Sequence, residues 1–311
     1  MKPTENIAVI DIGSNTLRLL IGNIKANKIN KIYTDRVVTQ LGKNLIKKGV
    51  ITEKAINSSI ITLKNFKKIS EKFNVSCIIA VGTSALREAK NSLYFCKTVK
   101  QSTGIYIHII SGKEEAYYTL HGVMDEELKE ENSVFIIDIG GGSTEWIHSS
   151  RNNFKIGSMP IGALKIKERF LNKEPYSEEE ISNAKKFIKE EIRKSLPQVK
   201  IDRFITTGGT ASTLGMINFE LSEYIPEKIH MAEIGVAETK QILKKLLSIS
   251  LKERKKIKGM PSDRADIICA GLLILEEVAD YLNAEKLNIS ENGIMEGIMK
   301  NYKNFCYNNT L

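Results

Sequence analysis

Two turns in the sequence combine an aspartate with glycine and small hydroxyl residues. The first is Asp11-Ile12-Gly13-Ser14-Asn15-Thr16, and the second is Asp138-Ile139-Gly140-Gly141-Gly142-Ser143-Thr144. A carboxylate can hold Mg²⁺, and backbone N–H groups beside glycine can surround a phosphate with no Cβ atom in the way. Either turn alone is weak evidence, because aspartate and glycine also occur in ordinary tight turns.

The second turn repeats the setting of the first. Val9-Ile10-Asp11-Ile12-Gly13 returns as Ile136-Ile137-Asp138-Ile139-Gly140, and each is followed by small polar residues and a second strand-like segment. An internal repeat of this kind indicates a duplicated structural unit. Two such turns can hold neighbouring phosphates from opposite sides, with Asp11 and Asp138 around one Mg²⁺-phosphate centre.

Further strand-like segments run into glycine or hydroxyl residues and then into predicted helices. Residues 77–81 lead to Gly82-Thr83-Ser84, residues 106–110 lead to Ser111-Gly112, and residues 204–207 lead to Gly208-Gly209-Thr210. This alternation predicts an α/β fold, in which ligands collect where strands end and helices begin. Other helices are predicted from Thr52 and from Ser177, which opens a capping box with Glu180.

Length and composition set limits on the architecture and on the partners. The chain has 311 residues, 42% hydrophobic and 27% charged, which is typical of a folded protein with two domains. Its net charge of +9 favours polyanionic partners without separating nucleic acid from polyphosphate. There is no signal-peptide pattern and no apolar run of roughly 20 residues, so we expect a cytoplasmic protein.

The cysteines show no pattern of a disulfide framework or a zinc site. Cys77, Cys96, Cys269 and Cys306 are scattered without a C-x-x-C pair, so we expect incidental thiols. The sequence also lacks a P-loop and a G-x-G-x-x-G fingerprint, which disfavours nucleotide folds of those kinds.

Taken together, these segments resemble the exopolyphosphatase/guanosine pentaphosphate phosphatase (Ppx/GppA) family of the actin-like ATPase and sugar kinase superfamily. The resemblance rests on residues 11–18 and 138–145, and it continues in order through residues 82–89, 111–116, 160–163, 207–210 and 264–266. It implies an α/β fold with two actin-like (ribonuclease H-like) lobes and an interlobe cleft. We expect residues 1–125 to form the N-terminal lobe and residues 126–311 the C-terminal lobe, whose last helix can pack back on the first.

The family resemblance implies hydrolysis by an activated water, which requires a carboxylate near the terminal phosphate. Glu114 and Glu115 are the contenders. The capping box Ser111-x-x-Glu114 gives Glu114 a structural task at a helix start, and the family motif places its base directly before an alanine, here Ala116. We therefore predict that Glu115 is the general base.

The resemblance also assigns a metal site and a set of phosphate-binding residues. Glu145 joins Asp11 and Asp138 around Mg²⁺ or Mn²⁺. Arg18 and Arg87 are expected to bind phosphate oxygens, although either could instead form a surface ion pair. The residues predicted to bind substrate are Gly13, Ser14, Asn15, Thr16, Arg18, Thr83, Ser84, Arg87, Gly140, Gly141, Gly142, Ser143, Thr144, Gly208, Gly209 and Thr210.

The predicted activity is release of terminal phosphate from polyphosphate, or conversion of guanosine pentaphosphate to tetraphosphate. A small-molecule kinase of the same superfamily and a non-catalytic sensor of guanosine tetra- or pentaphosphate stay open as alternatives. We expect a homodimer with no membrane partner and no specific nucleic acid partner. Two positions depart from the family pattern: Met295 stands where the family often has arginine, and Leu41-Gly42-Lys43-Asn44 replaces Leu-Gly-Glu-Gly.

Overall fold

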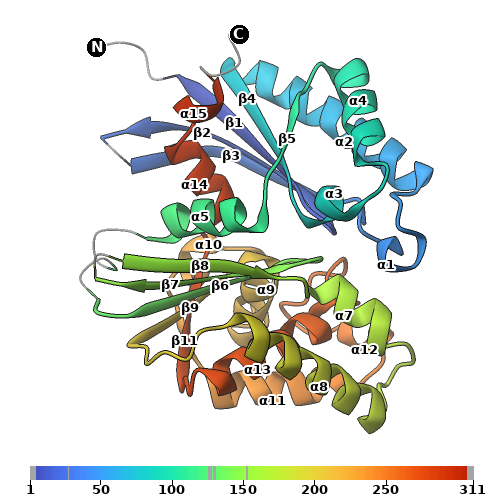
Figure 1. Ribbon diagram of the computed structural model, residues 1–311, viewed down its shortest axis with the longest axis vertical. Coiled ribbons are helices and arrows are strands. Elements are labelled where there is room, and N and C mark those ends of the chain that lie inside the picture. Colours follow the sequence, from blue (N-terminus) through green and yellow to red (C-terminus); the bar gives the residue numbers. More distant parts are fainter. Residues whose placement is uncertain (1–4, 27, 125–127, 129–130, 152, 307–311) are drawn as a thin grey trace. The chain divides into compact units, whose positions relative to one another are not determined.

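The computed structural model describes residues 5–26, 28–124, 128, 131–151 and 153–306 (Figure 1). The chain forms two compact units. Unit 1 takes in the residues up to Gly122 together with those from Ile294 onward, and unit 2 runs from Val123 to Gly293. Unit 2 is therefore inserted between two segments of unit 1.

Unit 1 contains one sheet and helices from both of its chain segments. Its elements are β1 (Asn6–Ile12), β2 (Thr16–Lys25), β3 (Lys28–Val38), α1 (Leu45–Lys48), α2 (Glu53–Lys72), β4 (Val75–Gly82), α3 (Ser84–Glu88), α4 (Ser92–Thr103), β5 (Ile107–Ile109), α5 (Gly112–Val123), α14 (Ile294–Lys300) and α15 (Lys303–Cys306).

Unit 2 contains the second sheet. Its elements are β6 (Val134–Ile139), β7 (Thr144–Ser150), β8 (Asn153–Met159), α7 (Ala163–Phe170), α8 (Glu178–Ser195), β9 (Arg203–Thr207), α9 (Gly208–Asn218), α10 (Pro226–Ile229), β10 (Glu233–Gly235), α11 (Val236–Leu247), α12 (Leu251–Arg254), α13 (Ile268–Tyr281) and β11 (Lys286–Ser290).

The two sheets have the same core topology. Unit 1 has the strand order β3-β2-β1-β4-β5, and unit 2 has β8-β7-β6-β9-β11 with β10 added at the edge. In each unit the first three strands along the chain form antiparallel pairs, and two further strands, β4 and β5 in unit 1 and β9 and β11 in unit 2, continue the sheet in parallel. The edge strand β10 pairs antiparallel with β11. The internal repeat expected from sequence therefore extends to whole sheets.

The sheet of unit 1 has an apolar layer on each face, because successive side chains of a strand point to opposite sides. Ala8 and Ile10 pack in one cluster with the apolar stripe of α2 and with α4. Ile7 and Val9 pack in another with α14 and α15. In Figure 1 these last two helices lie over the first three strands. The C-terminal segment thus covers a sheet face that would otherwise lack its core.

Unit 2 is held together by a single large cluster. Residues of β6 and β9, among them Phe135, Ile137 and Phe204, pack with the buried faces of α8, α11 and α13. α13 is buried over most of its length, which makes it the central helix of the unit. It packs against α7, α8 and α11.

The two helices that the sequence predicted most firmly are confirmed, together with their first residues. The Thr52 side chain accepts a hydrogen bond from the Ala55 N–H at the start of α2. Ser177 and Glu180 form the expected capping box at the start of α8. The third strand of each hairpin, β3 and β8, was not anticipated, because both strands carry many exposed and charged residues.

The expectation that the cysteines are incidental thiols was wrong for two of them. Cys77 on β4 and Cys306 on α15 form a disulfide, while Cys96 and Cys269 are free. The pair is separated by 229 residues in the sequence. Only the return of the C-terminal segment to unit 1 brings these sulfurs together, so their spacing in the sequence carried no sign of it.

Candidate active site

Asp11 lies at the end of β1 and is paired with an arginine across the hairpin. Asp11 stands directly opposite Arg18 of β2. The Arg18 Nε and Nη2 groups donate to Asp11 Oδ2 at 2.9 and 2.7 Å. Asp11 is 4% exposed, and its Oδ1 accepts no hydrogen bond from any residue of unit 1 that the structure describes. This buried oxygen is available to a cation or to a donor on a substrate.

The turn after Asp11 is closed by backbone contacts. The Gly13 N–H donates to the Thr16 carbonyl at 3.1 Å, and a Cβ on residue 13 would lie 2.9 Å from that carbonyl oxygen. The Ser14 and Asn15 carbonyls accept from N–H groups of residues 39, 40 and 42. Gly42 is needed here, since its Cβ would lie 2.9 Å from the Ser14 Cβ. In the sequence, Gly42 stands out only as part of an altered motif. Its support of the Ser14 turn is not visible there.

The end of β4 contributes Thr83, Ser84 and Arg87 to the same edge of the sheet. The Thr83 N–H donates to the Ile12 carbonyl at 3.3 Å, which fixes this junction beside the first turn. Ser84 donates to Glu88 at 2.8 Å. Arg87 donates from Nη1 to the Ile110 carbonyl at 3.0 Å.

Arg87 also forms an ion pair with Glu115. Its Nη1 lies 2.6 Å from Glu115 Oε2, and both side chains are largely buried. Glu115 belongs to the first turn of α5, which follows β5. The structure therefore brings the predicted base and two predicted phosphate-binding residues, Thr83 and Arg87, to the end of neighbouring parallel strands. An arginine held this way orients the carboxylate.

The neighbouring Glu114 is engaged in capping, as predicted. Its side chain accepts from the Ser111 N–H at 2.7 Å, and its own N–H donates to the Ser111 hydroxyl at 3.2 Å. Glu114 is thus tied to the start of α5, while Glu115 points to the arginine. The two adjacent glutamates have separate environments.

The turn after β6 in unit 2 repeats the first turn in its backbone. The Gly140 N–H donates to the Ser143 carbonyl at 3.0 Å, as Gly13 does to Thr16. The carbonyls of Gly140 and Gly141 accept from the Ala163 and Leu164 N–H groups, both at 2.9 Å. These are the first residues of α7, so the glycine turn is anchored by the start of a helix.

The side chains around this second turn differ from those of the first. Asp138 stands directly opposite Glu145 of β7, where unit 1 has an aspartate opposite an arginine. The Ser158 hydroxyl of β8 donates to Glu145 Oε1 at 2.7 Å, and both carboxylates are buried. Cβ atoms of directly opposite residues lie about 5 Å apart, and like charges there repel. A divalent cation with oxygen ligands would relieve that repulsion.

The end of β9 completes the edge of the second sheet. Thr207 stands opposite Asp138, and α9 begins at Gly208, whose φ is +84°. A Cβ on residue 208 would collide with Asp138 Oδ1. Glycine is therefore required both by the backbone and by the carboxylate. Thr210 follows, buried, in the first turn of α9.

Arg264 also reaches this edge. It was not among the site residues predicted from the sequence. A Cβ on Gly209 would lie 2.5 Å from the Arg264 Cζ, so the guanidinium lies against the first turn of α9. The N-terminus of a helix and an arginine both favour anions. The signal in the sequence was Arg264-Ala265-Asp266, which was recognised only as part of the family resemblance.

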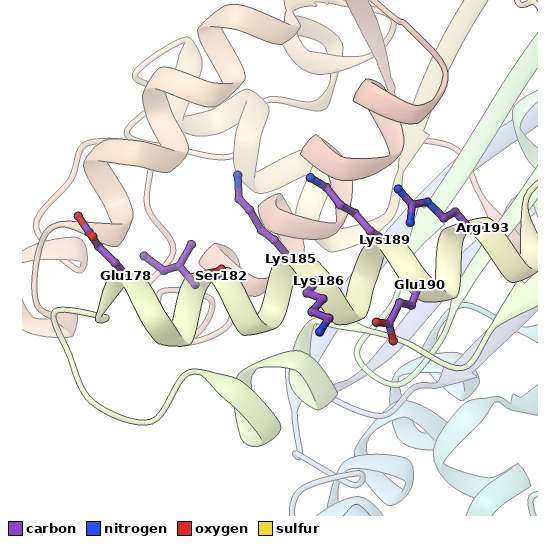
Figure 2. Close-up of a pocket in the computed structure, with 8 residues that line it drawn as sticks. Glu178, Ser182, Lys185, Lys186, Lys189, Glu190 and Arg193 are labelled. Atoms are coloured by element: carbon purple, nitrogen blue, oxygen red, sulfur yellow. The ribbon is translucent and has the colours of Figure 1, made fainter.

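A separate pocket of about 530 Å³ lies along α8. Figure 2 shows Lys185, Lys189 and Arg193 pointing to one side of that helix and Lys186 and Glu190 to the other. Lys185 pairs with Glu276 at 2.6 Å and Lys189 with Glu277 at 3.4 Å. Since these lysines are already matched by carboxylates, the pocket is a weaker anion site than the sheet edges.

The described residues contain no group of three or more His, Cys, Asp or Glu side chains arranged to hold a metal ion. A cation site in unit 2 would therefore rest on two carboxylates, completed by water or substrate oxygens, as is common for Mg²⁺. Asp138 and Glu145 fit that requirement. In the same described part of the chain, no helix has the length and apolar character needed to cross a membrane.

Two units of the same five-strand core topology, each with an aspartate-glycine turn between its first two strands, define an actin-like, ribonuclease H-like protein. This confirms the α/β class and the two-lobed actin-like architecture predicted from sequence. The family is shown directly: the chain belongs to the Ppx/GppA phosphatase family, whose model matches residues 20–303. The resemblance drawn from the motifs is thereby confirmed.

Individual relatives agree with this assignment. The chain is 34% identical to a bifunctional 3-dehydroquinate synthase/phosphatase of Fusobacterium nucleatum over 94% of its own length but only 46% of the relative's. It is 26% identical to exopolyphosphatase 2 of Mycobacterium tuberculosis, covering 94% of this chain and 97% of that one. The chain thus spans about half of the first relative and nearly all of the second.

Solved structures give the same result. A Ppx/GppA enzyme of Aquifex aeolicus is 31% identical, with a TM-score of 0.81 over 96% of this chain and all of that one. An exopolyphosphatase of Cytophaga hutchinsonii is 28% identical, with a TM-score of 0.86 over 96% of this chain and 97% of that one. The chain is accordingly a member of a phosphatase family.

Proposed function

We propose that this protein is a divalent-metal-dependent phosphoanhydride hydrolase that removes the terminal phosphate of polyphosphate or of guanosine pentaphosphate. The observation that carries the proposal is the placement of Glu115. It is buried beside Arg87 at the carboxyl edge of the unit 1 sheet, next to the junction of Thr83 and the turn after Asp11. A carboxylate held there is suited to take a proton from water.

In the proposed reaction, Glu115 accepts a proton from a water molecule whose oxygen forms a bond to the terminal phosphorus. The bridging P–O bond to the next phosphate breaks, and its electron pair leaves with the shortened chain. Orthophosphate is the second product. In unit 1, Arg18, Arg87 and the N–H groups at the glycine turn would compensate the charge of the phosphate oxygens. In unit 2, Arg264 and the start of α9 offer the same kind of anion contact.

Asp138 and Glu145 are the residues of unit 2 that would hold Mg²⁺ or Mn²⁺. The predicted role of Asp11 toward the metal stays an expectation from the sequence. When bound, the cation neutralises part of the charge of a polyanionic substrate. Asp138 and Glu145 fit this role because they are oxygen donors that stand directly opposite each other. The names of the relatives, exopolyphosphatase and phosphatase, support the same reaction class.

Phosphate release from polyphosphate and from guanosine pentaphosphate, measured side by side with Mg²⁺ and with excess chelator, tests this proposal. We expect release from at least one substrate, with the activity lost on chelation. Transfer of phosphate from ATP to a small acceptor without release from either substrate would indicate a kinase. Tight binding of guanosine pentaphosphate without turnover would indicate a sensor. Full activity in excess chelator would contradict the metal dependence.

A further inference from the structure

A fully buried arginine lies in unit 2, outside the set of residues discussed for the reaction. Arg254 is the last residue of α12, and its side chain is 0% exposed. Taking a guanidinium out of water is costly unless it is paired and hydrogen-bonded. The partners of Arg254 must therefore offset the cost of burying its guanidinium, and in doing so they fix the position of that group.

One side of the Arg254 guanidinium is matched by a glutamate and a tyrosine. Nη2 lies 2.6 Å from Glu174 Oε1 and donates to the Tyr176 hydroxyl at 3.3 Å. The same hydroxyl donates to Glu174 at 2.7 Å. Glu174 Oε2 accepts from the Leu251 N–H at 2.7 Å, so this carboxylate also holds the start of α12. Glu174 and Tyr176 thus hold the Nη2 side of the Arg254 guanidinium in place.

The other side of Arg254 reaches the chain beside Arg264. Its Nη1 donates to the Ala265 carbonyl at 2.7 Å, and both groups are buried. Ala265 directly follows Arg264, whose own N–H donates to the Pro261 carbonyl and whose carbonyl accepts from the N–H groups of Ile267 and Ile268. The peptide after Arg264 is thus tied to the interior of the unit by a charge-assisted hydrogen bond.

This tie bears on the anion site because the Arg264 guanidinium lies against Gly209 in the first turn of α9. We propose that Arg254 is a positioning residue for Arg264: through the Ala265 carbonyl it holds the Arg264 guanidinium where a phosphate would meet the start of α9. The inference rests on the proposed function for its ligand class, a condensed phosphate. It predicts that Arg254 acts on binding without contacting the ligand.

Arginine suits this task because its fork can bind partners in two directions at once. A lysine at position 254 could satisfy Glu174 or the Ala265 carbonyl but would not span both. Arg254→Lys should therefore keep the charge and lose the positioning. Arg254→Met removes both the charge and the hydrogen bonds while keeping much of the volume.

The test is a double-mutant cycle on positions 254 and 264, with equilibrium binding of tripolyphosphate, in the absence of added metal, as the readout. We expect Arg254→Met to weaken binding about tenfold, as expected when a charge-assisted contact is misplaced. In an Arg264→Ala background the same change should weaken binding less than twofold, because the two residues act as one unit. Arg254→Lys should lie between wild type and Arg254→Met.

Glu277→Gln is the matched control. Glu277 is 3% exposed and faces Lys185 and Lys189 of α8 from its place on α13. It is thus a buried charge of the same unit that takes no part in the Arg254 network. We expect it to change the melting temperature while leaving tripolyphosphate binding within twofold of wild type. Should Arg254→Met fail to fold, Arg254→Lys takes its place in the cycle.

The outcomes separate the inference from the proposed function. Equal weakening by the position 254 variant in both backgrounds would overturn the positioning role, as would equal effects of that variant and Glu277→Gln on binding. If the wild type binds tripolyphosphate and the mutant effects are non-additive, but no phosphate is released from either substrate, the proposed hydrolysis alone is overturned. A wild type that binds no tripolyphosphate leaves Arg264 without an anion, and the inference fails.

Discussion

The two hairpin turns share a backbone but differ in the residue that faces the aspartate. In unit 1, Asp11 is matched by Arg18, and Glu115 is likewise matched by Arg87. In unit 2, Asp138 faces Glu145. The same position in a duplicated fold thus holds a compensated pair in one copy and two like charges in the other.

This difference suggests different roles for the two turns in the proposed reaction. A carboxylate beside an arginine has its countercharge within the protein, which suits a base and a phosphate-binding edge. Two buried carboxylates that face each other repel, and a cation between them would relieve the repulsion. Under the proposed function, we therefore expect unit 1 to serve the substrate and the attacking water, and unit 2 to hold the cation. The predictions below test that division.

The largest effect is expected from the base in unit 1. Glu115→Gln should lower kcat by roughly a hundredfold or more, the usual contribution of general-base catalysis, with substrate binding little changed. Glu114→Gln is the control, since Glu114 serves in the capping of α5. Steady-state phosphate release checks both variants. If the control loses turnover and Glu115→Gln does not, the base has been assigned to the wrong glutamate.

The next effect concerns the cation site of unit 2. Glu145→Gln should raise the Mg²⁺ concentration for half-maximal activity by about tenfold or more, since loss of a supporting group costs metal affinity on that scale. Arg18→Gln, at the equivalent position of unit 1, should leave that concentration nearly unchanged and raise KM instead. Mg²⁺ titrations of the two variants measure this. Equal shifts would show that the two hairpins do not divide the work.

A substitution of Gly208 tests whether Asp138 depends on the absence of a Cβ at position 208. Gly208→Ala should destabilise the fold by about 1–3 kcal/mol, because φ is positive. It should also raise the Mg²⁺ concentration for half-maximal activity, because the new Cβ would displace Asp138. Gly104→Ala has a similar φ of +76°, with only the Lys67 Nζ nearby. It should cost stability and leave activity intact. Chemical unfolding and Mg²⁺ titration distinguish strain alone from strain with displacement.

The smallest effect is expected on the free energy of unfolding at acidic pH. Burial raises the pKa of Glu174, but hydrogen bonds from Tyr176 and Arg254 and the Arg254 charge outweigh it and hold that pKa below the ordinary 4.5. Stability from this carboxylate is therefore present above pH 4.5 and lost as the pH falls through the lower folded value. Between pH 6 and pH 3.5, wild type should lose more unfolding free energy than Glu174→Gln. A larger loss in the variant would reverse the sign.

Sequence predicted the parts of the fold that depend on local patterns. The two aspartate-glycine turns, the helix starts at Thr52 and Ser177, and the distinction between Glu114 and Glu115 all rest on contacts a few residues apart. Each is visible in the sequence because glycine, capping residues and apolar spacing act locally. The family resemblance supplied the two-lobed, actin-like architecture.

The parts that were missed depend on contacts between distant residues. Arg264 is defined by its approach to Gly209, and Arg254 by three partners spread over the unit. The Arg18 and Arg87 ion pairs were weighed only as alternatives. Their roles toward phosphate, and those of the other predicted site residues, stay predictions until ligand binding is measured.

The disulfide between Cys77 and Cys306 has a consequence for the covalent topology of the chain. Unit 2 is inserted between the two segments of unit 1, and the two cysteines lie in those segments, on either side of the insertion. The bond therefore closes a covalent ring that contains all of unit 2. A single proteolytic cut anywhere in that ring leaves both fragments attached, and they separate only under reducing conditions.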